Sequence, residues 1–315
     1  MARPIVAAAG SRREFPVWRG EGLDMKLIAR SLVVIFVALI AVPALAVTQT
    51  ITTAVQLLAA TTGLFMGGTQ HPLSNPPDSD AFIDEYMDLA ETNYIIPVTG
   101  AVPNSRVAVI YPAEFFPVFG SRTFDDSVLV GRQNLNSCIR GGACNGTLSV
   151  PRAPGDTFVI FGYSTSAVVA SLVKQDLIDN PTGAPTITEF FLDANPMRPN
   201  GGIEARGFEG LTIPFIGITF YGPTENSCPG PAACDDLGTF QTTDTAEQYD
   251  FLGGDAPARL SPLAFANSIA ASALLHGNVP NRTIDGTDPT VIYQDTYGDT
   301  DYYLITAPRL PLLML

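Results

Sequence analysis

Short apolar runs alternate with amphipathic segments along most of the chain. The clearest run, at residues 157–161, is followed by a helix-like stretch at 167–178. The same alternation predicts the remaining elements: strands at 106–111, 188–192, 245–249 and 301–305, helices at 81–92, 125–135 and 262–275, and an early apolar stretch at 57–66. Strands that alternate with helices in this way form mostly parallel sheets. We therefore expect an α/β fold with helices on both faces of the sheet.

One long segment interrupts this alternation. Residues 195–254 are rich in glycine, proline and threonine, and they contain an apolar piece at 211–218. Long irregular segments in compact domains usually carry a function, such as a lid or a wall over a site. We expect this excursion to lie over the active-site end of the sheet, where its apolar piece would line a groove for an acyl chain.

The segment at residues 25–46 has the pattern of an export signal. It begins with a methionine, carries basic residues at its start, continues as an uncharged apolar core and ends in Ala-Leu-Ala. The charge-free span at 31–47 is at the short end for crossing a bilayer, so a cleaved signal peptide and a membrane anchor formed by residues 27–46 both remain open. Residues 1–24 would then lie upstream of the true start, and residues 47–315 would form the α/β-hydrolase domain. We expect the protein in the cell envelope, the periplasmic space or the medium.

The chain is strongly acidic. It has 31 aspartates and glutamates against 17 lysines and arginines, which gives a formal net charge of −14. Such a charge repels nucleic acids and anionic phosphates, so neither is an expected partner. Neither a cofactor nor a metal ion is expected to take part in the reaction.

The four cysteines fall into two local pairs. Cys138 and Cys144 form one pair, and Cys228 and Cys234 form the other, each among small and turn-forming residues. Loop closure favours a disulfide within each pair, which agrees with export. A metal site built from all four cysteines is the alternative, but its usual short spacings are absent.

Ser164 is the strongest candidate for a catalytic residue. It lies in Gly162-Tyr163-Ser164-Thr165-Ser166, directly after the predicted strand and before the predicted helix. A strand, a sharp turn and a helix around such a serine describe the nucleophile elbow of α/β-hydrolases, in which small residues two positions away let strand and helix cross closely. A glycine- and serine-rich turn without chemistry is the alternative.

A serine nucleophile requires a base, and the chain contains only two histidines, His71 and His276. In the α/β-hydrolase order of serine, acid and histidine, only His276 lies downstream of Ser164, although a histidine at a helix end also often serves in capping or packing. Asp255, on a glycine-rich turn after the strand at 245–249, is the preferred acid to orient His276. Asp250 is the second candidate and would otherwise brace that turn.

Acyl transfer also requires backbone N–H groups that stabilise the oxyanion. One should come from Thr165, directly after the nucleophile. Another should come from the early turn Gly67-Gly68-Thr69, for which we name Gly68 and Thr69. An ordinary glycine turn is the alternative for this early segment.

With these residues assembled, the chain resembles the PE-PPE domain family, serine α/β-hydrolases related to cutinases, from about Leu57 to the C-terminus. The resemblance depends on the following motifs: Gly67-Gly68-Thr69, Gly162-Tyr163-Ser164-Thr165-Ser166, Asn195-Pro196-Met197-Arg198-Pro199-Asn200-Gly201-Gly202, Gln248-Tyr249-Asp250, His276-Gly277, Tyr302-Tyr303-Leu304-Ile305-Thr306 and Leu310-Pro311-Leu312-Leu313. The chain departs from the family at Gln70, where a glycine is usual, and at residues 249–257, which are one residue longer.

The resemblance implies an enzyme that forms an acyl-enzyme on Ser164. Its substrates would be lipid esters of the cell envelope, and the acceptor would be water or a sugar hydroxyl, as in acyl transfer between trehalose glycolipids. The implied partners are a lipid or ester substrate, including acylated trehalose, at or near a membrane. A short- or medium-chain carboxylesterase and a non-catalytic envelope lipid-binding protein on the same scaffold are the alternatives.

Overall fold

A seven-stranded sheet forms the centre of the computed structural model, which describes residues 60–315 except 146–147, 150–155, 184–187, 228–239 and 256–260. Residues 25–46 and the pair Cys228 and Cys234 lie outside the described residues. The strands in sheet order are β10 (Val291–Tyr297), β11 (Thr300–Ile305), β9 (Thr242–Glu247), β6 (Thr188–Asp193), β5 (Thr157–Tyr163), β1 (Thr61–Met66) and β2 (Ser105–Ala108). Every neighbouring pair is parallel except β10 and β11, which form an antiparallel hairpin at the edge of the sheet.

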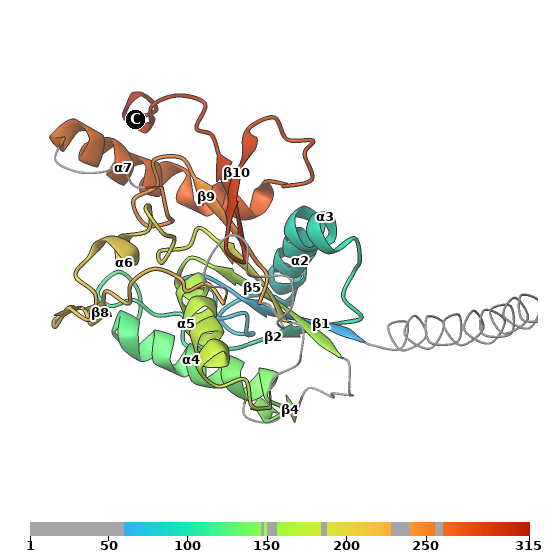
Figure 1. The fold of residues 1–315 in the computed structure, drawn as a ribbon. Helices are drawn as coiled ribbons and strands as arrows, with labels where there is room; N and C mark the ends of the chain where they lie inside the picture. Colours follow the sequence, from blue (N-terminus) through green and yellow to red (C-terminus); the bar gives the residue numbers. More distant parts are fainter. Residues whose placement is uncertain (1–59, 146–147, 150–155, 184–187, 228–239, 256–260) are drawn as a thin grey trace, which may run out of the picture. The chain divides into compact units, whose positions relative to one another are not determined.

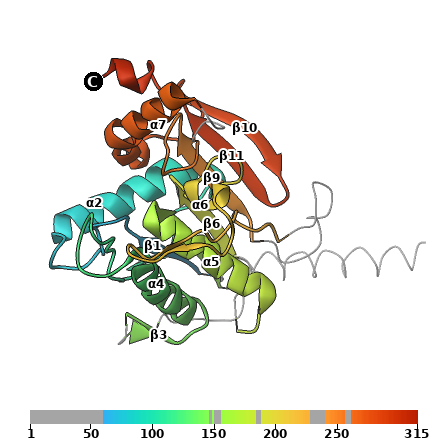
Figure 2. The same cartoon turned by 90° about the vertical axis from the view of Figure 1, so that its left-hand side faces the viewer.

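Helices cover both faces of this sheet (Figures 1 and 2). The helices, including the short π- and 3₁₀-segments labelled η, are α2 (Asp80–Ala90), η1 (Glu91–Ile95), α3 (Ile96–Thr99), α4 (Phe124–Ile139), α5 (Thr165–Asp179), α6 (Ile203–Arg206), α7 (Pro262–Leu274), η2 (His276–Asn281) and η3 (Pro311–Leu313). Alternate side chains of β5 show the two faces: Ile160 belongs to the core under α4 and α5, whereas Val159 and Phe161 belong to the core under α2. The expected α/β fold, a mostly parallel sheet covered on both faces, is therefore confirmed.

Most of the predicted elements form close to their expected positions. The strand expected at 245–249 begins earlier, at Thr242, and every residue of β9 is buried. The sequence reasoning did not find β10, whose residues after Val291 are all exposed because it is the edge strand. Two small hairpins, β3 (Ala143–Cys144) with β4 (Leu148–Ser149) and β7 (Thr212–Ile213) with β8 (Ile218–Thr219), complete the strands.

A buried ion pair ties α5 to the edge hairpin. Nζ of Lys174 donates hydrogen bonds to Oδ1 of Asp299 (2.8 Å) and to Oγ1 of Thr242 (2.7 Å), and both charged side chains are fully buried. Asp299 lies in the turn between β10 and β11, and its second oxygen accepts a hydrogen bond from the backbone N–H of Ser227. Burial lowers the pKa of Lys174, while the carboxylate of Asp299 opposes this shift. The pair fixes the position of β10 and β11 relative to the helix layer.

The first cysteine pair forms the expected local disulfide. Cys138 near the end of α4 is bonded to Cys144 of β3. The thiols of this pair are thus not available as metal ligands, which argues against the four-cysteine alternative. Within the parts of the chain that the structure describes, no helix has the length and apolar character needed to cross a bilayer.

Candidate active site

Ser164 lies at a sharp turn between β5 and α5. Its backbone has a φ of 56° and a ψ of −117°, a region that side-chain-bearing residues rarely adopt. The turn requires Gly162, because a Cβ there would lie 2.6 Å from the carbonyl oxygen of Ser166. The hydroxyl of Ser166 in turn donates a hydrogen bond to the carbonyl oxygen of Met66, at the end of the neighbouring strand β1. This is the geometry of a nucleophile elbow, with Ser164 at the carboxyl ends of the central strands.

His276 reaches Ser164 from the other end of the chain. Its Nε2 lies 2.8 Å from Oγ of Ser164, although 112 positions separate the two residues. The residue follows α7, and its carbonyl oxygen accepts a hydrogen bond from the Tyr163 hydroxyl (2.6 Å). The structure therefore brings the predicted serine and histidine into hydrogen-bonding contact.

Asp250, and not Asp255, is the carboxylate beside His276. Oδ2 of Asp250 lies 2.6 Å from Nδ1 of the histidine. The carboxylate of Asp255 instead accepts a hydrogen bond from the backbone N–H of Tyr249 (2.9 Å). The preference for Asp255 is thus wrong. Asp250 contacts the histidine, and Asp255 braces the turn.

The turn after β9 explains this exchange. Asp250 comes three residues after the end of β9, and the chain then bends back so closely that a Cβ at Gly253 would lie 2.1 Å from Oδ2 of Asp250. Asp250 therefore stays near the end of β9, while the turn continues beyond it to Asp255. We refer below to the hydrogen-bonded array of Ser164, His276 and Asp250 as the triad.

The environment of Asp250 keeps its carboxylate ionised. Burial by itself raises the pKa, but the hydrogen bond and charge of His276 and a hydrogen bond from Ser272 outweigh burial, so the pKa of Asp250 is below its ordinary value. Oδ1 accepts from the hydroxyl of Ser272 (2.6 Å) and from the N–H of Leu252 (3.1 Å). The carboxylate is thereby held in one orientation.

The other histidine is not part of the triad. Nδ1 of His71 lies 2.8 Å from Asp78, and its ring stacks on Phe82 with 4.5 Å between the ring centroids. It lines the same cleft as Ser164, but its ring nitrogen is paired with a different carboxylate. The sequence favoured His276 because it is the only histidine downstream of Ser164, and this geometry agrees with that choice.

The segments expected to form the oxyanion site also meet at Ser164. Thr165 is the first residue of α5, where a backbone N–H has no acceptor within the helix. Its hydroxyl lies 2.6 Å from the hydroxyl of Thr69, and Gly68 packs so closely on Tyr163 that a Cβ there would lie 2.8 Å from the tyrosine ring. Gln70, at the family's usual glycine position, has a φ of 78°, so it adopts the left-handed backbone that favours glycine.

Two cavities meet at Ser164. The larger, about 690 Å³, is open and is lined by the triad serine and histidine and by side chains of α2 such as Phe82 and Tyr86. The smaller, about 120 Å³, is mainly apolar. Its walls come largely from the excursion: Pro196, Ile203, Glu204, Ile213, Ile218 and Phe220. The excursion therefore covers one side of the site, as expected from the sequence.

Glu204 is the one acidic side chain in the wall of this smaller cavity. It is buried, and Oε2 accepts a hydrogen bond from the N–H of Tyr221 (3.3 Å). Burial raises its pKa to about 8, so the side chain is mostly uncharged at neutral pH. An uncharged acid is compatible with an apolar cavity, whereas a carboxylate would be costly there.

Sequence reasoning missed several residues that shape the site. Ser272 lies on α7 and contacts Asp250, 22 positions earlier in the chain, so no local spacing pointed to it. Glu204 gave no signal either, because its burial depends on how the excursion folds. Within the described ranges, no cluster of three or more histidine, cysteine, aspartate or glutamate side chains is arranged to hold a metal ion.

Comparison with known proteins decides the family. The sequence profile of the PE-PPE domain matches residues 103–315. The chain belongs to the PE-PPE domain family. This confirms the resemblance drawn from the sequence motifs, although the matched stretch begins later than Leu57. The PE-PPE match contains the triad but not Gly68 and Thr69.

Two relatives from Mycobacterium tuberculosis are similar to about four fifths of this chain. The chain is 31% identical to the uncharacterized PPE family protein PPE28 over 263 residues, which cover 81% of this chain and 35% of that protein. It is also 31% identical to a protein named Esterase PE16 over 261 residues, which cover 80% of this chain and 43% of that protein. The chain thus spans less than half the length of either relative. Among solved structures, a cutinase-like protein from Cryptococcus sp. is similar over 53% of this chain and 71% of its own, with 16% identity and a TM-score of 0.29.

Proposed function

We propose that the chain is a serine esterase that forms an acyl-enzyme on Ser164. The observation that carries this proposal is the triad geometry: Ser164 Oγ lies 2.8 Å from His276 Nε2, and His276 Nδ1 lies 2.6 Å from Asp250, at a strained elbow beside two cavities. The relative named Esterase PE16 supports the same class of reaction. A serine that is bonded to a histidine, which is itself oriented by a carboxylate, is the general arrangement of an activated nucleophile.

In the first half of the reaction, His276 Nε2 accepts the proton of Ser164 as Oγ attacks the ester carbonyl. The negative oxygen that forms is stabilised by backbone N–H groups of Thr165 and of the Gly68–Thr69 segment. Asp250 holds the Nδ1 proton of His276 and stabilises its positive charge. The tetrahedral intermediate then collapses, and the departing alcohol takes its proton from Nε2, which leaves the acyl group on Ser164.

In the second half, an acceptor hydroxyl attacks the acyl-enzyme while Nε2 of His276 takes its proton. The bond between the acyl carbon and Oγ of Ser164 then breaks, and Nε2 returns the proton to Oγ. Water gives the free acid, and a sugar hydroxyl gives a new ester. The open cleft of about 690 Å³ has room for an alcohol much larger than water. We therefore include acyl transfer to a sugar such as trehalose or an acylated trehalose in the proposal.

The two cavities suggest which part of the substrate binds where. The smaller, apolar cavity suits the acyl chain, and its volume of about 120 Å³ favours a short chain over a long one. The open cleft suits the alcohol. Among saturated esters of one alcohol, we expect kcat/KM to rise with each methylene until the cavity is filled and then to fall.

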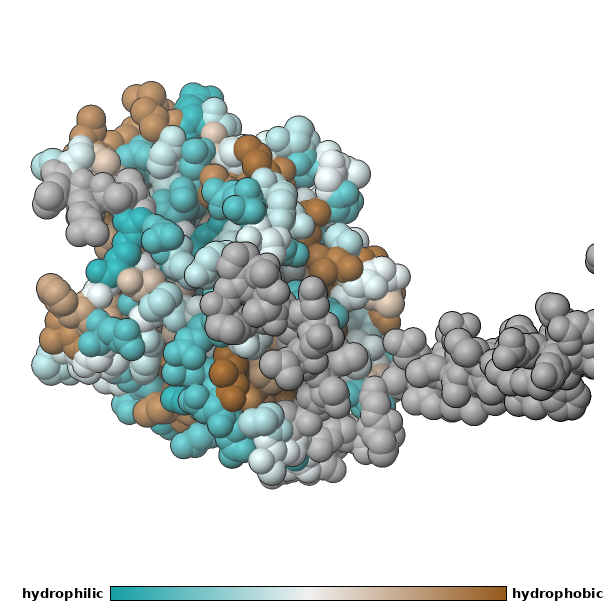
Figure 3. All heavy atoms as spheres, viewed as in Figure 1, coloured by the Kyte–Doolittle hydropathy of each residue, from teal (hydrophilic) through white to brown (hydrophobic). Residues whose placement is uncertain are grey.

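Exposed apolar side chains on two parts of the surface support a lipid substrate. Phe208 (83% exposed) and Phe215 (75%) flank β7, and Leu263 (71%) lies on α7. Apolar side chains gather over both regions of the surface (Figure 3). The region around β7 adjoins the site, because Ile213 of β7 lines the smaller cavity, whereas Leu263 lies at the end of α7 that is distant from His276. A surface of this kind fits contact with lipid in the cell envelope.

Export belongs to the same proposal. The signal-like segment at residues 25–46 would carry the domain across the cytoplasmic membrane, and the disulfide between Cys138 and Cys144 fits an oxidising compartment. Fractionation of cells that express the tagged full chain tests this point. Recovery only from the cytosol with an intact N-terminus would reject export.

Covalent labelling and ester turnover test the enzymatic proposal together. A fluorophosphonate probe should label the native chain, and Ser164→Ala should abolish both labelling and hydrolysis of nitrophenyl esters. His276→Ala and His71→Ala form a matched pair, because each histidine contacts an aspartate but only His276 contacts Ser164. Loss of activity in His71→Ala alone would overturn the assignment of the base. An absence of labelling and turnover in the folded native chain would favour the non-catalytic lipid-binding alternative.

Product analysis tests acyl transfer separately. With one acyl donor held constant, rising trehalose should increase acylated sugar at the expense of free acid. Free acid as the sole product at every trehalose concentration would leave a plain esterase.

A further inference from the structure

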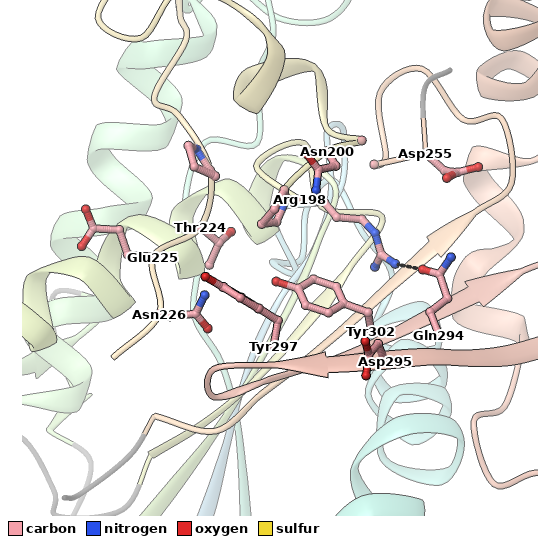
Figure 4. Close-up of a pocket in the computed structure, with 14 residues that line it drawn as sticks. Arg198, Asn200, Thr224, Glu225, Asn226, Asp255, Gln294, Asp295, Tyr297 and Tyr302 are labelled. Atoms are coloured by element: carbon pink, nitrogen blue, oxygen red, sulfur yellow. Dashed lines mark hydrogen bonds between the residues drawn. The ribbon is translucent and has the colours of Figure 1, made fainter. Parts of the chain in front are cut away.

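A third cavity, of about 740 Å³, lies apart from the two cavities at Ser164. Its walls come from the loop after β6 (Arg198–Gly201), residues 223–226, the turn at Gly254–Asp255 and the hairpin of β10 and β11. Figure 4 shows these segments around the side chains of Tyr297 and Tyr302. The cavity has no lining residue in common with either cavity beside the triad. A ligand here would not occupy the space in which the ester reacts.

The cation in the wall of this cavity is already neutralised. Arg198 is 4% exposed, and one of its terminal nitrogens donates to the carboxylate and the carbonyl of Asp244. The other terminal nitrogen donates to Oε1 of Gln294 (2.6 Å) and to the carbonyl oxygen of Tyr303 (3.1 Å). A phosphate or carboxylate ligand would have to compete with these bonds, so an anion gains little here.

The carboxylates around the cavity are likewise engaged or turned outward. Asp255 accepts the backbone N–H of Tyr249, and Asp295 accepts the backbone N–H of Thr296. Glu225 accepts from Nε2 of Gln175 (3.2 Å), and in Figure 4 its carboxylate points away from the two tyrosine rings. Each of these three carboxylates thus already accepts a hydrogen bond, which reduces what it gains from a cationic ligand.

Neutral groups face the cavity instead. The hydroxyl ends of Tyr297 and Tyr302 both point toward Thr224 and Asn226 (Figure 4). Oδ1 of Asn226 accepts from the N–H of Asp299 (3.2 Å), which fixes the amide and leaves its NH₂ group as a donor. Oε1 of Gln294 is fixed by Arg198 in the same way. The cavity thus combines the phenol ring of Tyr297, and that of Tyr302 with Arg198 5.0 Å from its centroid, with amide groups whose orientation is set by other bonds.

We propose that this cavity binds a neutral sugar of one or two rings. The apolar C–H face of a pyranose packs on a phenol ring, while its hydroxyls bond to amide and hydroxyl groups. The volume is in the range of small-molecule sites. The site goes beyond the proposed esterase reaction, because it shares no residue with the triad cavities, and it would hold the protein on sugar-bearing material while Ser164 stays free.

Tyr297 and Tyr293 provide a matched pair for the test. Both lie on β10 and are similarly exposed, 58% and 52%, but only Tyr297 lines the cavity. Tyr293 packs on Tyr303 instead. Saturation-transfer NMR and calorimetric titration would use the full chain with cellobiose and trehalose, and with choline and inorganic phosphate as charged probes. Melting temperatures would verify that both alanine variants fold.

We expect a sugar Kd in the millimolar range, weakened about five- to tenfold in Tyr297→Ala and little changed in Tyr293→Ala. Equal weakening in both variants would overturn the proposal. It would also be overturned if neither sugar bound at about 20 mM, or if choline or phosphate bound more tightly than the sugars. The measurement uses no ester turnover, so its failure is distinct from failure of the esterase proposal.

Discussion

Replacement of Asp250 by asparagine should inactivate the chain almost completely, although it changes neither the size nor the shape of the side chain. Oδ1 of Asp250 accepts hydrogen bonds from the Ser272 hydroxyl and from the N–H of Leu252. A backbone N–H can only donate, so the asparagine oxygen should occupy the Oδ1 position. The amide NH₂ group then faces Nδ1 of His276, in place of the Oδ2 atom that now lies 2.6 Å away.

That arrangement selects the wrong form of the histidine. An NH₂ group opposite Nδ1 requires Nδ1 to be an acceptor, so the proton of the neutral ring moves to Nε2. Nε2 can then no longer accept the proton of Ser164. In a serine protease triad, the same substitution lowers kcat about 10⁴-fold, which corresponds to about 5.5 kcal/mol in the activation barrier. We expect a loss of about 10³- to 10⁴-fold here, mainly in kcat.

Asp255→Asn is the matched control. Its carboxylate accepts one hydrogen bond, from the N–H of Tyr249, and an amide oxygen can accept the same bond. Hydrolysis of a nitrophenyl ester by both variants, with KM and kcat separated, should show activity within a few-fold of native for Asp255→Asn. A greater loss in Asp255→Asn than in Asp250→Asn would refute the reasoning and return the role of the acid to Asp255.

Three further changes test other parts of the structure. Ser164→Gly should be inactive yet about 1–2 kcal/mol more stable than Ser164→Ala in urea unfolding, because glycine relieves the positive φ; equal stability would show that the elbow is not strained. Lys174→Met should cost about 3–5 kcal/mol, since it leaves Asp299 buried without its cation, whereas Arg106→Met, which breaks an exposed pair with Asp88 and a longer contact with Glu91, should cost clearly less; similar costs would contradict this account. Burial raises the pKa of Glu204 to about 8, so between about pH 5 and 8 the folded chain holds a proton that the unfolded chain has released, and the free energy of unfolding falls as pH rises. Glu204→Gln should reduce that slope, and an unchanged slope between pH 5.5 and 8 would show that this carboxyl does not titrate as described.

Local patterns in the sequence were sufficient to predict the fold class and the position of Ser164 at the elbow. The buried central strands are short apolar runs, and the elbow depends on small residues within two positions of Ser164. Both features can therefore be predicted from the local sequence. The edge strand β10 was not predicted, because its apolar run at residues 291–293 is only three residues long and is followed by polar ones. Its place in the sheet depends on pairing with β11 and on the distant contact between Lys174 and Asp299.

The sequence by itself determined which serine and which histidine would meet, because only one elbow and only one downstream histidine are present. Only the tertiary structure showed which of the two aspartates lies beside His276. Asp250 and Asp255 follow the same strand, and the choice between them depends on a turn in which Gly253 lets the backbone pass beside the carboxylate. The cavities were also beyond the sequence, since the excursion contributes walls to the acyl cavity and to the proposed sugar cavity only after it folds over the sheet. Contacts within a few residues are encoded locally, whereas contacts between distant segments depend on how the whole chain packs.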